Sequence, residues 1–151
     1  LSRAVADTDA RRVLVLAAAD VADVRAPAGV EADVMAVTEV QLVIGAATFA
    51  SSATGSDAVG VEREVRRAVL AARWARVVPD VGGRVQADRM LDAARGLLSQ
   101  PSVLLTVLTG DATPAGHEAA LLSGIAASHP GVDVVVLTGA LAGHGVQMGA
   151  E

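Results

Sequence analysis

Two apolar segments in the C-terminal half of the chain constrain its fold more than any other feature. They are rich in valine and leucine and span residues 102–108 and 132–137. Short apolar runs of this kind are typical of strands in a parallel sheet. Between them, Pro114 after Thr113 marks the start of a helix, and His129-Pro130 marks its end. This order predicts a β-loop-α-β unit, whose ligand sites lie at the C-terminal ends of the strands.

The loop after the first of these strands holds the candidate site residues Thr109, Gly110 and Asp111. A hydroxyl, free backbone N–H groups and a carboxylate at the start of a helix could hold a small polar ligand or a metal-bound phosphate. The alternative is a simple turn, made by Gly110 and capped by Asp111 and Thr113. The loop has no glycine-rich phosphate cradle, no lysine and no cysteine, which argues against a catalytic role.

His144 is the fourth candidate, because it lies among three glycines in residues 139–145 and is expected to be exposed. His117 stands beside Glu118, but adjacent helical residues point to different faces, so we expect it on the solvated surface. No serine has a nucleophile-elbow setting. Three scattered histidines without cysteine do not have metal-ligand spacing, so the sequence predicts no metal site.

The remaining chain alternates between strand and helix patterns. Strands are expected at 12–16 and 32–37, helices at 39–50, 57–72 and 87–98, and a hairpin or loop that turns at Gly82-Gly83. The helix after Pro114 is expected to bury Leu121, Leu122 and Ile125. The predicted fold class is therefore α/β, with two small βα units, mainly parallel sheets and helices packed on their faces. We divide the chain into 1–78, a hairpin or linker at 79–86, and 87–151.

Composition excludes several classes of function. Although 52% of the residues are hydrophobic, no uninterrupted apolar stretch approaches the roughly 20 residues of a membrane span. A net charge of −5, with one Phe and one Trp, is unsuited to nucleic acid binding. The absence of cysteine excludes disulfides and is typical of a cytoplasmic protein. Glu62 and Glu64 are interleaved with Arg63, Arg66 and Arg67, which favours a helix surface with salt bridges.

Several segments occur in an order that resembles a known family. They are LSRAVADTDARRVLVLAAA (1–19), ADVMAVTEVQLVIGAATFA (32–50), AARWARV (71–77), LLTVLTGDA (104–112), VDVVV (132–136) and the terminal 139–151. Together they resemble the C-terminal half of the fatty-acid kinase A subunit, which is related to dihydroxyacetone kinases. The resemblance covers nearly the whole chain, with a gap near Gly82-Gly83.

The resemblance implies a non-catalytic module of lipid metabolism that forms a homodimer or docks a fatty-acid-carrier subunit. In that family, ATP and magnesium bind an N-terminal kinase domain, whose aspartates this chain lacks, so no cofactor is expected here. Two alternatives stay open. One is a small phosphatase or hydrolase using Thr109, Asp111 and His144, and the other is a degenerate remnant with a structural role only.

Overall fold

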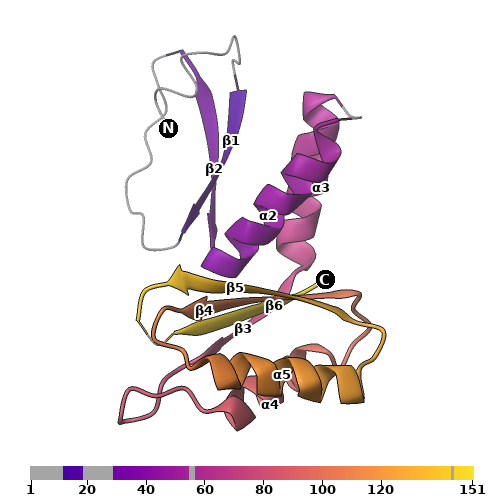
Figure 1. Cartoon of the computed structure of the whole chain (residues 1–151). Helices are drawn as coiled ribbons and strands as arrows, with labels where there is room; N and C mark the ends of the chain where they lie inside the picture. The colour runs from indigo at the N-terminus through magenta and orange to yellow at the C-terminus, as the bar shows by residue number, and fades with distance from the viewer. Residues whose placement is uncertain (1–11, 19–28, 55–56, 144) are drawn as a thin grey trace. The chain divides into compact units, whose positions relative to one another are not determined.

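The computed structural model describes residues 12–18, 29–54, 57–143 and 145–151, and these residues form a mixed α/β protein (Figure 1). Helices alternate with strands along most of the chain, as the hydrophobic patterns predict. The elements are β1 (Arg12–Ala18), β2 (Glu31–Val37), α2 (Glu39–Ser52), α3 (Ala58–Ala71), β3 (Arg73–Val77), α4 (Ala87–Leu97), β4 (Leu104–Gly110), α5 (Ala115–Ser128), β5 (Asp133–Leu141) and β6 (Val146–Ala150).

The chain divides into two compact units, Leu1–Val69 and Leu70–Glu151. This division comes earlier than the linker that the sequence suggests at 79–86. The reason is that β3 pairs with β6, which ties residues 73–77 to the second sheet. Segment 79–86 is therefore a loop inside the second unit, and the sequence pattern alone could not assign β3 to a partner so distant along the chain.

The first unit contains a parallel pair of strands, β1 and β2, with α2 and α3 beside it. Thr38 begins α2 with a capping box: its hydroxyl accepts from the Gln41 N–H, and Gln41 Oε1 accepts from the Thr38 N–H at 3.0 Å. Gln41 Nε2 also donates to the Val69 carbonyl at 3.0 Å, which joins α2 to α3. Asp57 caps α3 by accepting from the Gly60 N–H.

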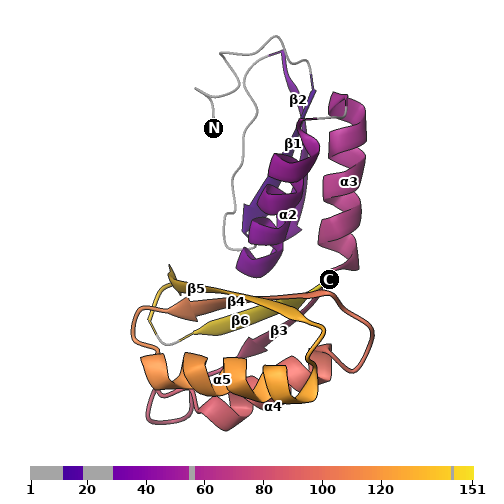
Figure 2. The ribbon, with the colours of Figure 1, turned by 45° about the vertical axis from the view of Figure 1, so that its right-hand side comes forward.

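The second unit contains a four-stranded sheet in the order β3-β6-β4-β5. Strands β3, β4 and β5 run in one direction, and β6 runs antiparallel between β3 and β4. Both α4 and α5 cover the same face of this sheet (Figure 2). Their buried side chains meet inward-facing residues of the strands, so Met90, Leu121, Ile125, Leu105 and Met148 form the centre of the core.

One local expectation for this unit is wrong: Leu122 is 41% exposed, because only positions 121 and 125, one helical turn apart, face the sheet. Of the hairpin or loop expected at Gly82-Gly83, the structure forms the loop: the Asp80 carboxylate accepts from the N–H groups of Gly82 and Arg84 and closes it. This bonding lowers the pKa of Asp80, chiefly through the Arg84 N–H, because it favours the charged carboxylate.

Strand β6 is the element that the sequence pattern misses. Its five residues, VQMGA, are all buried. Strands β3 and β4 pair with its two edges, so β6 is a central strand of the sheet. A strand in this position has no alternation of polar and apolar residues, and it contains glycine and glutamine, which are weak strand signals. The pattern therefore shows only a glycine-rich segment, where the fold has a central strand.

Candidate functional site

The predicted site residues Thr109, Gly110 and Asp111 lie at the C-terminal end of β4, as the β-loop-α-β pattern predicts, but they do not form one site. Thr109 is fully buried, and its hydroxyl donates to Glu118 Oε1 at 2.9 Å. Asp111 is exposed, and its side chain makes no hydrogen bond or ion pair with the described residues. His144 lies outside the described residues.

Glu118 organises the polar contacts at this end of the sheet. Its carboxylate accepts from Thr109 and also from the Thr138 hydroxyl at 3.1 Å, so it links β4, α5 and β5. The sequence signals the position only weakly, because a glutamate in a first helical turn is common on protein surfaces. With its hydroxyl bonded in this way, Thr109 is a structural residue.

Gly110 makes the closest backbone approach in this loop. Its N–H donates to the Gly145 carbonyl at 2.9 Å, and the Thr113 N–H donates back to the Gly110 carbonyl at 3.1 Å. A Cβ at position 110 would overlap the carbonyl oxygen of Gly143. The turn proposed for Gly110 is therefore present, whereas neither Asp111 nor the Thr113 side chain caps α5.

A small pocket of about 360 Å³ adjoins this loop and is lined by Arg84, Val85, Ala112, Thr113, Pro114 and His117. The sequence placed His117 on the solvated surface, but its ring is half-buried and its Nδ1 is shielded from solvent. Within the described part of the chain, neither His117 Nδ1 nor Thr113 Oγ1 has a hydrogen-bond partner. Unsatisfied buried polar atoms are uncommon in folded proteins, so two in one small pocket are a notable feature.

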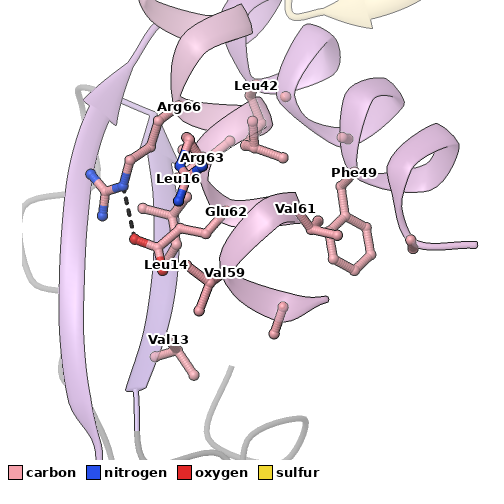
Figure 3. A pocket seen from close by; sticks show the side chains of 15 residues that line it. Val13, Leu14, Leu16, Leu42, Phe49, Val59, Val61, Glu62, Arg63 and Arg66 are labelled. Carbon is pink, nitrogen blue, oxygen red and sulfur yellow. Dashed lines mark hydrogen bonds and ion pairs between the residues drawn. The ribbon is translucent and has the colours of Figure 1, made fainter. Parts of the chain in front are cut away.

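The first unit contains a large apolar groove of about 1000 Å³ (Figure 3). Strand β1 and helices α2 and α3 form its walls. Its apolar lining includes Val13, Leu14, Leu16, Leu42, Phe49 and Val59. A large apolar concavity with a few charged groups is the usual form of a ligand or partner site. We refer to it as the α2/α3 groove.

Three charged residues of α3 also line the α2/α3 groove. Arg66 Nε donates to Glu62 Oε1 at 2.9 Å, and the same guanidinium pairs with Asp33 on β2. The hydrogen bond that Arg66 donates to Glu62 is the main cause of the raised pKa of Arg66, with a smaller contribution from Asp33. Arg63 is exposed and makes no ion pair with the described residues. The groove therefore presents one uncompensated positive charge beside an apolar surface.

Gly45 brings α2 close to the other walls of the groove. A Cβ at this position would collide with Leu16 Cδ1 and would lie 3.0 Å from Val69 Cγ2. The absent side chain therefore allows α2 to pack closely on β1 and α3. The spacing of apolar residues in 39–50 predicts the helix but does not show that position 45 is its contact point.

The described part of the chain has no group of three or more His, Cys, Asp or Glu side chains placed to hold a metal ion. Within the same residues, none of the helices combines the length and apolar character that crossing a membrane requires. Comparison with family models gives no match, and comparison with characterised proteins gives none either. Fold and site thus define an α/β protein with an apolar groove in one unit and a small polar pocket in the other.

Proposed function

We propose that this chain is a non-catalytic docking module that binds a fatty-acid-carrier subunit through the α2/α3 groove. The observation that carries the proposal is the groove itself: a mainly apolar concavity of about 1000 Å³, lined also by Arg63, which makes no ion pair with the described residues. The resemblance to the fatty-acid kinase A subunit supplies the partner class. A cytoplasmic location and a homodimeric assembly belong to the same proposal.

The chemistry of the groove suits such a partner. A carrier of fatty acid presents apolar surface around a long hydrocarbon cargo, and burying apolar surface contributes roughly 25 cal/mol per Å² to association. The cargo carboxylate, or an acidic side chain near it, complements Arg63. Because Arg66 already pairs with two carboxylates, Arg63 is the cation available for this role.

The loop at the C-terminal end of β4 favours a non-catalytic role over hydrolase activity. A nucleophilic hydroxyl needs a base within hydrogen-bond reach and access to substrate. Thr109 is fully buried and bonded to a carboxylate that also binds Thr138, while Asp111 faces solvent without a partner among the described residues. In the proposal, ATP and magnesium belong to the kinase domain of the related proteins and not to this module.

Calorimetric titration of the chain with a fatty-acid-carrier subunit loaded with a long-chain fatty acid tests the proposal. Val59→Asp places a charge on the groove wall, and we expect it to weaken binding at least about tenfold. The fold should tolerate this change, because Val59 is 63% exposed and an acidic residue in the first turn of a helix is favourable. Circular dichroism checks that the variant is folded.

The matched control is Val103→Asp, which introduces the same charge at a position that is 73% exposed and lies in the second unit, outside the groove. It should bind the carrier as the unsubstituted chain does. No binding by the unsubstituted chain over a broad concentration range, or equal loss in both variants, would contradict the proposal. If Val59→Asp only converts a dimer to a monomer in sedimentation experiments, the groove is a dimer contact instead.

A further inference from the structure

We infer that the pocket lined by Arg84, Thr113 and His117 in the second unit binds a phosphate group, as carried by a small phosphate ester. The inference is independent of the proposed docking function, because it concerns the second unit and none of the residues of the α2/α3 groove. It rests on three features of the pocket: unsatisfied donors in its wall, a free guanidinium, and the beginning of a helix.

The first feature is the pair of polar atoms without partners. Thr113 is only 9% exposed, it lines the pocket, and its Oγ1 has no hydrogen-bond partner among the residues that the structure describes. The Nδ1 atom of His117, one helical turn further on, is also shielded and unpartnered. A hydroxyl and a ring N–H can both donate to a phosphate oxygen, so an occupant with several acceptor oxygens would satisfy both atoms.

The second feature is the charge of Arg84. Its side chain is exposed and makes no hydrogen bond or ion pair with the described residues, although its backbone closes the loop on Asp80. A guanidinium can bind two phosphate oxygens at once through parallel N–H donors. Because Arg84 lines the same pocket as Thr113 and His117, one anion could contact all three side chains.

The third feature is the start of α5, a helix of 14 residues. Its N-cap is Pro114, in an extended conformation, and no side chain caps the helix, so the favourable position for an anion is not taken by the protein itself. The sequence pattern instead placed Thr113 as the cap and Pro114 as the first helical residue. Because the structure begins the helix one residue later, the Thr113 hydroxyl is left unbonded beside the pocket.

Three carboxylates near the pocket oppose an anion. The Asp80 carboxylate accepts from the backbone N–H groups of Gly82 and Arg84. Glu118 lies in the same helical turn, but its oxygens accept from Thr109 and Thr138. Asp111 is exposed and does not line the pocket. The volume of about 360 Å³ leaves room beyond a single phosphate ion for the organic part of an ester, which Val85 and Pro114 would contact.

Titration with inorganic phosphate and with methyl phosphate, followed by ¹H–¹⁵N NMR of the whole chain at constant ionic strength, tests the inference. We expect saturable shifts at Thr113, His117 and the Arg84 side chain, and no such shifts with chloride. Arg84→Gln should weaken binding at least about tenfold. The matched control is Arg95→Gln on α4, which removes an exposed arginine outside the pocket and should leave the affinity unchanged.

Thr113→Val separates a binding role from a structural one. Valine keeps the shape of threonine and removes the unpartnered hydroxyl, so the variant should unfold at the same or a higher urea concentration and bind phosphate several-fold more weakly. Absence of saturable shifts at millimolar phosphate overturns the inference. Equal loss of affinity in the Arg84 and Arg95 variants also overturns it, as does destabilisation by Thr113→Val. None of these results bears on carrier binding by the first unit.

Discussion

The two units of the chain have hydrophobic clusters of different size. In the second unit, two helices cover one face of a four-stranded sheet, and thirteen hydrophobic residues form a buried cluster. In the described residues of the first unit, the corresponding cluster has four members, Val37, Val61, Val65 and Val69, beside a groove of about 1000 Å³. The buried cluster of the second unit is therefore larger than the one formed by the described residues of the first unit, although both units also expose large apolar side chains such as Phe49 and Val81.

This difference separates the kinds of ligand that the two units can bind. Apolar surface left open in the first unit favours association with an apolar partner, since its burial is still available as a driving force. The pocket of the second unit contains two buried polar atoms without a hydrogen-bond partner among the described residues, which favours a small polar ligand. Three substitutions test how different the units are.

The largest effect is expected at Gly110, in the more completely packed unit. A Cβ there meets the carbonyl oxygen of Gly143, and backbone cannot move aside as a side chain can. Gly110→Ala should lower the free energy of unfolding by about 3 kcal/mol in urea titrations. Gly131→Ala is the control, because nothing lies within 4 Å of its added Cβ, and it should change stability by less than about 0.5 kcal/mol. Equal effects would show that the close contact is unimportant.

A smaller effect is expected at Gly45, in the unit with the open groove. Alanine favours a helix by about 1 kcal/mol over glycine, but here its Cβ collides with Leu16, so Gly45→Ala should destabilise by about 1 kcal/mol in total. Gly96→Ala, in α4 with open space around it, should instead stabilise by about 0.5–1 kcal/mol.

Hydrogen exchange locates the effect of the Gly45 substitution. Protection should fall in β1, α2 and α3 and stay unchanged in β4 and β6, if the two units open separately. A uniform decrease in protection across all strands would show instead that the two units unfold together.

The smallest effect is expected for the Asp80 loop of the second unit. In the folded chain, the pKa of Asp80 lies below its ordinary value of 3.8. As the pH falls toward 3.8, the folded chain therefore binds fewer protons than the unfolded chain. The resulting stability is present above pH 4 and is lost as the pH falls through the lowered pKa. Asp80→Asn should make the free energy of unfolding less dependent on pH in this range, as acid titrations at fixed urea concentration would show. The same pH dependence in the variant and the unsubstituted chain would contradict this.

Much of the fold could be predicted from local patterns in the sequence. The runs at 12–16, 32–37 and 102–108 lie within or overlap strands, and the amphipathic spacing after Asp57 gives α3. These signals are local, because each depends on the few residues that share one face of an element. The predicted salt bridges on α3 are confirmed at Arg66, which pairs with Glu62 one helical turn away.

The candidate site could be predicted only in its position. The strand-end rule places it at Thr109–Asp111, next to the small pocket, but the pocket's own side chains come from two separate segments, 84–85 and 112–117. Arg84 belongs to a segment that the sequence predicts as a hairpin or loop, and Thr113 was expected to cap a helix. No local pattern indicates that Arg84 meets Thr113 and His117, since this approach depends on how β4 and α5 pack against segment 79–86.

The sequence by itself determined the α/β class, the position of most helices and strands, and the exclusion of disulfide chemistry, because hydrophobic periodicity and residue type are local properties. Only the tertiary structure decided that β6 is a central strand, that the units divide at Val69, and which side chains line the groove and the pocket. Those features depend on contacts between residues far apart in the chain. Their geometry is set by packing, which no single segment encodes.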